Sequence, residues 1–217
     1  MIRVRNIEVN NIQNAIRGAR NPLESWDQID SYYDYQNEKD EKEVYIIGDV
    51  DMDLLLRLIK AGTDHSKFMR QIFVSMDITA PLYFFKEFDT YKVATVANST
   101  STMHTLHKHN ITTQLFSVED LDSKSLDVFK EYCKYLETLR ISFLETKDKV
   151  YWRQLIQMLP DSFNQTRTWT GNYQTLRNMY HNRKNHKLTE WKEFCSEYIE
   201  KLPYSELIVT KPNKGNI

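Results

Sequence analysis

Alternation of apolar and polar residues marks strands in the first third of the chain. Residues 68–78 alternate regularly, and the side chains of a strand point in turn to opposite faces, so this segment predicts a strand with one buried face. Residues 44–47 predict a shorter strand, and the polar stretch 20–42 before it predicts a surface excursion. An opening strand with one irregularity is predicted by an apolar series, namely Ile2, Val4, Ile7 and Val9.

Apolar residues spaced three and four apart predict helices between these strands. Asn11 is expected to cap a short helix that ends near Gly18, and residues 54–59 form one apolar helix face. Thr79 and Pro81 predict the start of a further helix, with a hydroxyl cap and a proline in the first turn.

The second half of the chain is predicted to be helical. Before it, the hydroxyl-rich run 98–102 marks a loop or a helix start, because such side chains compete for backbone hydrogen bonds. The helical spacing then covers four segments: 126–143, 150–158, 169–183 and 188–199. Strands early and helices late favour an α+β domain over a regular alternation of strands and helices.

Length and composition narrow the class of protein. A chain of 217 residues suits one domain, predicted over 1–209, with a disordered tail over 210–217. Lys+Arg 29 against Asp+Glu 30 argues against a broad basic surface for nucleic acid. Without a long uncharged apolar run or a leader-like start, we expect a cytoplasmic protein with no membrane segment. Cys133 and Cys195 sit in amphipathic patterns and are expected to be buried free thiols.

The few glycines limit how a nucleotide could be held. Only 5 are present, and the chain has no glycine-rich dinucleotide loop and no Walker-type loop, so a bound nucleotide or flavin must be held by side chains and helix ends. The histidines at 104, 107 and 109 do not have the spacing of a helical metal site, and no metal is predicted.

One motif series spans much of the chain. It runs Leu159-Pro160, Trp169-Thr170-Gly171-Asn172, Leu176, Asn178, Arg183, His186 and Glu190, and it is preceded by His65-Ser66-Lys67-Phe68. In order and in most spacings this series resembles the flavin-dependent thymidylate synthases. The resemblance extends from about residue 65 to residue 191. It implies that family's fold, with a mixed or antiparallel sheet flanked by long helices.

The resemblance breaks down at the family's signature, which is Arg-His-Arg followed after seven residues by Ser. An ungapped count from His65 places the triplet on Thr90-Tyr91-Lys92 and the serine on Thr100. Two further family arginines fall on Thr102 and Ile156. The flavin side of the family pattern is therefore better preserved than the side that holds nucleotide phosphate.

The resemblance implies FAD as cofactor and a role for each matching residue. Arg183 is the expected catalytic cation, which polarises the pyrimidine. Flavin contacts are implied for His65, Thr90, Tyr91, Lys92, Asn98, Asn172, Gln174 and Asn178. Nucleotide contacts are implied for Glu87, Thr100, Thr102 and Arg183. The expected small molecules are dUMP, methylenetetrahydrofolate and NADPH, and the expected assembly is a homotetramer.

The residues also leave other interpretations open. If 169–183 is a helix, Asn172 and Arg183 share a face with Leu176 and Met179, and that face is equally typical of a plain amphipathic helix. The departures at the signature allow a different modification at C5 of a pyrimidine. They also allow a homologue that has lost catalysis and binds nucleotide or flavin as a regulatory subunit.

Overall fold

A computed structural model describes residues 2–35 and 44–211. Part of the predicted surface excursion and most of the predicted tail lie outside these described residues. The central element is a four-stranded antiparallel sheet in the order β1-β4-β6-β5. Its strands are β1 (Arg3–Asn10), β4 (Phe73–Pro81), β5 (Val96–Ser99) and β6 (Asn164–Asn172).

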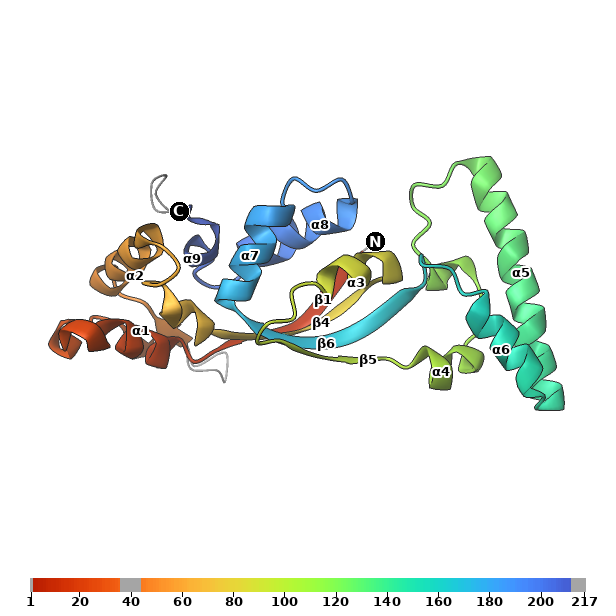
Figure 1. Cartoon of the computed structure of the whole chain (residues 1–217), viewed down its shortest axis with the longest axis horizontal. Coiled ribbons are helices and arrows are strands. Elements are labelled where there is room, and N and C mark those ends of the chain that lie inside the picture. The colour runs from red at the N-terminus through yellow and green to blue at the C-terminus, as the bar shows by residue number, and fades with distance from the viewer. Residues whose placement is uncertain (1, 36–43, 212–217) are drawn as a thin grey trace.

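Helices cover one face of this sheet and extend the molecule at both ends (Figure 1). Those on the covered face are α3 (Leu82–Phe88), α7 (Tyr173–Arg183), α8 (Thr189–Glu193) and α9 (Glu206–Val209). At one end lie α1 (Ile12–Arg20) and α2 (Asp49–Ala61), with the hairpin of β2 (Tyr32–Asp34) and β3 (Val44–Ile46). At the other end lie α4 (Thr102–Thr105), α5 (Ser123–Thr146) and α6 (Lys149–Gln157).

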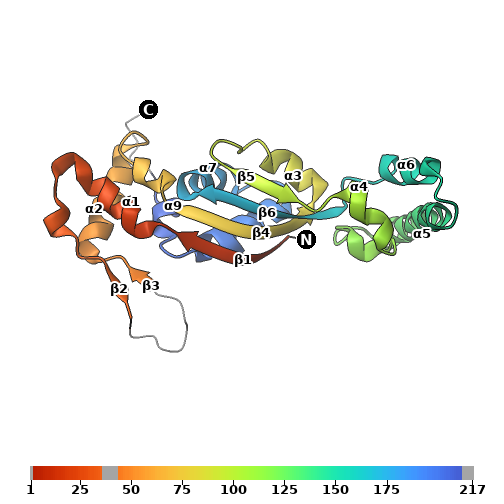
Figure 2. The same ribbon diagram turned by 90° about the horizontal axis from the view of Figure 1, so that it is seen from below.

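The two faces of the sheet differ in chemistry because side chains alternate along each strand. Val74, Met76 and Trp169 point into the main core under the helices. Figure 2 looks onto the opposite face, where no helix among the described residues covers the strands. Hydroxyl pairs join β4 to β6 on that face: Ser75 with Thr170 at 2.7 Å and Thr79 with Thr166 at 2.8 Å. A second, smaller apolar cluster lies between α5, α6 and the segment before α5.

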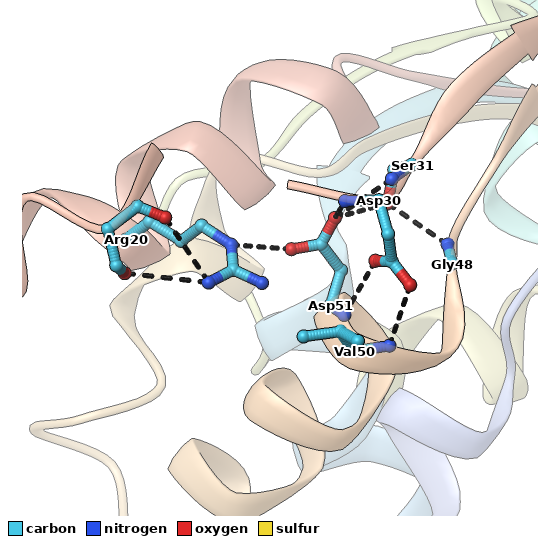
Figure 3. Close-up of polar contacts among 7 residues, drawn as sticks. Arg20, Asp30, Ser31, Gly48, Val50 and Asp51 are labelled. Carbon is cyan, nitrogen blue, oxygen red and sulfur yellow. Dashed lines mark hydrogen bonds and ion pairs between the residues drawn. The ribbon is translucent and has the colours of Figure 1, made fainter. Parts of the chain in front are cut away.

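A buried ion pair fixes α1 to α2 (Figure 3). Arg20 Nε donates to Asp51 Oδ1 at 2.6 Å, and both side chains are almost fully buried. The other carboxylate oxygen of Asp51 accepts from Ser31 Oγ at 2.6 Å and from the backbone N–H groups of Asp30 and Ser31. Asp30 in turn accepts from the first N–H groups of α2, at Val50 and Asp51. This exchange satisfies donors at the start of the helix that have no partner inside it.

The predicted helix over 169–183 is wrong in its first part. Residues 164–172 form β6, which pairs with β4 and β5, and α7 begins only at Tyr173. Gln165, Arg167 and Trp169 lie on the covered face and alternate with threonines on the open face, which is the period of a strand. The expectation of a helical second half is corrected accordingly, because a strand at the centre of the sheet comes from it.

Further boundaries differ from the predictions. The strand predicted over 68–78 starts only at Phe73, because Lys67–Arg70 form a 3-10 helix. It continues through Pro81, since its last residues pair with β6, so Thr79 caps no helix and α3 starts at Leu82. The helix α1 passes Gly18 and ends at Arg20. Asn11 does not cap it by its side chain; its amide donates to Gln71 O at 2.8 Å.

Other predictions are confirmed. The irregularity in the first strand is a shift of register between Arg5 and Glu8, where Asn6 has a φ of 51°. The cysteines 133 and 195 are buried free thiols, and burial raises the pKa of Cys195 to about 12. The run 98–102 is only partly as predicted. Asn98 and Ser99 end β5, a strand that was not predicted, and Thr102 starts the helix α4.

In the part of the chain that the structure describes, no helix is long and apolar enough to span a membrane.

Candidate functional site

The candidate site lies where the end of α7 meets α3 and α8. Leu176 and Met179 on α7 are fully buried against the sheet, and Arg183 continues that face at the last residue of the helix. Its side chain therefore emerges where the core ends and is 23% exposed. The end of α7 thus places a planar cation where the core meets solvent.

Arg183 is held by a carboxylate and a phenol. Its Nη1 lies 2.8 Å from Glu87 Oε2, and its Nε donates to Tyr91 Oη at 3.0 Å. The same carboxylate oxygen lies 3.2 Å from His186 Nε2. Glu87 is on α3 and Tyr91 follows that helix, so four side chains from two segments far apart in sequence converge on one point. The cation is fixed in orientation, and part of it stays open to solvent.

Aromatic rings form the wall behind this cation. The guanidinium carbon lies 5.4 Å from the Trp191 ring centre and 5.6 Å from that of Tyr91, within the range of cation–π attraction. Tyr83 Oη donates to the buried carboxylate of Glu190, which ties α8 to α3. Burial and this hydrogen bond raise the pKa of Tyr83 above its ordinary value.

The motif Trp169-Thr170-Gly171-Asn172 is the end of β6, directly before α7. A Cβ built on Gly171 would lie 2.3 Å from the Trp169 ring, so only glycine fits beside the indole. Asn172 is 3% exposed and stands at the N-cap of α7, where its Oδ1 accepts from Thr175 N at 2.9 Å. It is therefore not on the helix, and the face predicted for it is wrong. Its contact with flavin stays a prediction.

Replacing Asn172 by alanine is expected to lower the free energy of unfolding by about 1–2 kcal/mol, because the cap of α7 is lost in a buried place. Urea unfolding followed by circular dichroism measures this. Asn178→Ala is the matched control, since Asn178 is exposed on the same helix. Equal unfolding midpoints for the two variants would show that the cap contributes nothing.

Gln174 and Asn178 form a second polar pair on α7. Gln174 Nε2 donates to Asn178 Oδ1 at 3.0 Å, and both side chains reach solvent. At 100° per residue, Arg183 lies about 140° around the helix from Asn178. The amide pair and the cation thus point in different directions.

Most of the remaining predicted residues lie outside this cluster, between the end of α3 and the start of α4. Thr90 donates its hydroxyl to Glu87 O at 2.7 Å, and Lys92 is exposed in the turn that follows. Asn98 lies on β5 opposite Thr168, on the open face of the sheet. Thr100 is bonded to the sheet edge: its N–H donates to Thr166 O at 2.8 Å. Thr102 is half-buried at the start of α4.

His65 is exposed in the turn after α2 and lines a cavity of about 420 Å³. The walls of this cavity come from α1, α2 and the segments beside them, and include Arg20 and Phe68 but no residue of α7. Of the predicted site residues, the chain therefore brings Glu87, Tyr91 and Arg183 into one cluster, whereas His65 lies beside a cavity that is lined by other elements.

Two members of the cluster were not among the predicted site residues. His186 belongs to the motif series, and its place three residues after Arg183 was the available signal. The sequence predicted Trp191 only as an apolar core residue. Its place beside the guanidinium depends on how α8 packs. Within the described ranges, no group of three or more His, Cys, Asp or Glu side chains is arranged to hold a metal ion.

No protein-family profile matches the chain, and no curated protein matches it by sequence. Two solved structures of thymidylate synthase X from Helicobacter pylori, each with FAD and dUMP, are similar in fold. One has a TM-score of 0.67 at 16% identity and covers 97% of both chains. The other has a TM-score of 0.64 at 17% identity and covers 95% of this chain and 97% of its own. The predicted α+β fold of a flavin-dependent thymidylate synthase is thereby confirmed.

Proposed function

We propose that this protein is a divergent flavin-dependent thymidylate synthase, which methylates dUMP at C5 with a folate as one-carbon donor. The observation that carries this proposal is the cluster of Glu87, Tyr91 and Arg183. The family resemblance assigned each of these residues to the site from separate parts of the sequence, and they meet within hydrogen-bonding distance. The fold, shared with structures that hold FAD and dUMP, supports the same proposal.

Arg183 is the residue that acts on the nucleotide in this proposal. A guanidinium presents a rigid fork of N–H donors that suits a pyrimidine carbonyl or a phosphate. Tyr91 and Glu87 fix the fork, so little side-chain freedom is lost when a nucleotide binds. The aromatic wall keeps water from one side of the cation, which strengthens its field at the substrate.

The residues present fit a flavin in part. Gln174 and Asn178 have amides that reach solvent and can form hydrogen bonds with the edge of a flat ring. His65 lines a different cavity, together with residues of α1 and α2. FAD would supply the hydride, with NADPH as its reductant. Because no residue of α7 lines the cavity beside His65, we propose that flavin sites form between subunits of a homotetramer. The proposed location is the cytoplasm.

A second candidate function has its own support. Thr102 is half-buried at the start of α4 and Ile156 packs on the smaller apolar cluster, so neither replaces a phosphate-binding arginine. Glu87 already neutralises Arg183. These features favour a catalytically inactive relative that binds nucleotide or flavin as a regulatory subunit, or an enzyme that modifies C5 of a pyrimidine differently.

The visible spectrum of the purified protein with added FAD separates these functions from an unrelated one. We expect FAD to bind and its absorption bands to shift. If flavin binds, tritium release from C5-labelled dUMP, with methylenetetrahydrofolate and NADPH present, tests the reaction. Flavin binding without release would support the regulatory function, and no binding of either flavin or dUMP would contradict both.

Glu87→Gln is expected to tighten dUMP binding by roughly threefold to tenfold, because the amide no longer competes with an anionic ligand for Arg183. Calorimetric titration with dUMP measures the dissociation constant. Glu131→Gln is the control, since Glu131 makes an exposed ion pair with Lys134 on α5. Weaker binding in Glu87→Gln would contradict this competition and would mean that the carboxylate supports binding, either by contact with the nucleotide or by orienting Arg183.

A further inference from the structure

A separate cavity is lined by residues at the end of the molecule where Figure 1 shows α4, α5 and α6. Its volume is about 360 Å³, which falls within the size range of small-molecule sites. The cavity is lined by six residues: Met103, His107, Phe143, Lys147, Lys149 and Trp152. None of them belongs to the cluster around Arg183, and none was predicted to bind a ligand.

Rings form the walls of this cavity. Trp152 Nε1 donates to Met103 O at 3.2 Å, which fixes the indole of α6 against α4. The rings of His107 and Phe143 meet edge to face with their centres 5.4 Å apart. Flat apolar surfaces held in this way favour a flat ligand, because an aromatic ring can stack on them or meet their edges.

A buried ionic network holds the loop that carries His107. Arg140 on α5 donates to His107 O at 3.2 Å, to Asn110 Oδ1 at 2.9 Å and to both carboxylate oxygens of Glu137. Glu137 also accepts from Ile111 N at 2.7 Å, and its hydrogen bond with Arg140 lowers its pKa. The loop is thus anchored to α5 at both ends, and the cavity is formed before any ligand arrives.

Two lysines add positive charge at the rim. Lys147 joins α5 to α6 with a φ of 59°, and Lys149 is the first residue of α6. Among the described residues, neither lysine takes part in an ion pair. In the same part of the chain, His107 Nδ1 is buried without a hydrogen-bond partner. Native structures rarely leave such groups unsatisfied.

The geometry points to a binding site in this cavity for a small aromatic molecule that carries an anionic group. The ring lies between Trp152 and Phe143, and the anionic group lies toward Lys147 and Lys149. The site does not rest on the proposed function, since it shares no residue with the Arg183 cluster. Two sources of this chemistry are a pyrimidine nucleoside monophosphate and an aminobenzoyl carboxylate such as the tail of a folate.

Calorimetric titration of the full chain with dUMP and with p-aminobenzoyl-glutamate tests the site. Both probes are also titrated into Arg183→Ala, which removes the proposed nucleotide site and leaves this cavity unchanged. We expect at least one probe to bind Arg183→Ala and to change the fluorescence of Trp152. Uridine, which lacks the anionic group, is expected to bind at least about tenfold more weakly than dUMP if the nucleotide is the ligand.

The double variant Lys147→Asn, Lys149→Gln locates the anionic group. Asparagine tolerates the positive φ at position 147, and removing a cation from the start of α6 does not oppose its helix dipole, so the fold is expected to persist. Affinity for the binding probe should fall about tenfold. Lys124→Gln, in the first turn of α5, is the control and should leave affinity unchanged.

Each outcome decides the proposal. Binding to Arg183→Ala that is lost in the double lysine variant supports it, and the probe that binds identifies the source of the ligand. Binding that survives in the double variant, or a fluorescence change that persists in Trp152→Phe, places the ligand elsewhere and overturns it. Absence of binding by either probe at millimolar concentration also overturns it.

Discussion

Asp51→Ala is expected to lower the free energy of unfolding by about 3–5 kcal/mol, because it leaves the guanidinium of Arg20 buried without its counter-charge. The substitution also removes the acceptor for Ser31 Oγ and for two backbone N–H groups. The junction of α1, α2 and the β2–β3 hairpin depends on these bonds (Figure 3). Urea unfolding followed by circular dichroism measures the effect.

Asp53→Ala is the matched control, on the same helix two residues later. Asp53 pairs with Arg57 at 2.9 Å, but its side chain is 68% exposed, so solvent screens the pair. Exposed pairs of this kind stabilise a helix by about 0.3–0.5 kcal/mol. If the two variants unfold at the same urea concentration, burial of the Arg20–Asp51 pair does not contribute as argued.

Arg183→Ala is expected to reduce the proposed activity by about 100-fold or more, because it removes the cation that polarises the pyrimidine. The rate of tritium release from C5-labelled dUMP is the measurement. Arg183→Lys keeps the charge but loses the planar fork and the bond to Tyr91, so we expect it to recover only a small part of the rate.

Arg153→Ala serves as the control for this series, since Arg153 is exposed on α6. Circular dichroism and the unfolding midpoint should be nearly the same for the two alanine variants, because Arg183 lies at a helix end and is partly exposed. A rate for Arg183→Ala equal to that of the unmodified protein removes Arg183 from the mechanism.

The sequence alone predicted an element where one spacing of apolar residues, that of a helix or that of a strand, dominated the segment. The spacing of the segment 126–143 placed α5, and the alternation from Ile72 to Ile78 placed most of β4, although the strand predicted from residue 68 starts only at Phe73. The burial of Cys133 also followed from its place on an apolar face. In each case the side chains that report the period are also the ones that the fold buries, so sequence and packing agree.

β6 was not predicted, because no single spacing of apolar residues dominates its segment. Its covered positions hold Gln165 and Arg167 as well as Trp169, so the strand period is carried by polar side chains and the apolar signal is weak. Arg167 is accommodated there because its guanidinium lies 4.0 Å over the Phe85 ring and pairs with Asp89. Neither partner is near in sequence, and without them the segment is equally compatible with a helix.

The sequence by itself determined the α+β class, most of the helices and the motif that ends at Arg183 and His186. Only the tertiary structure decided which residues that motif meets. Glu87 reaches Arg183 because β4, β6 and α8 bring α3 beside the end of α7, across 96 positions of the chain. Arg20 and Asp51 likewise meet across 31 positions. Such pairings depend on how elements pack, and no local spacing specifies them.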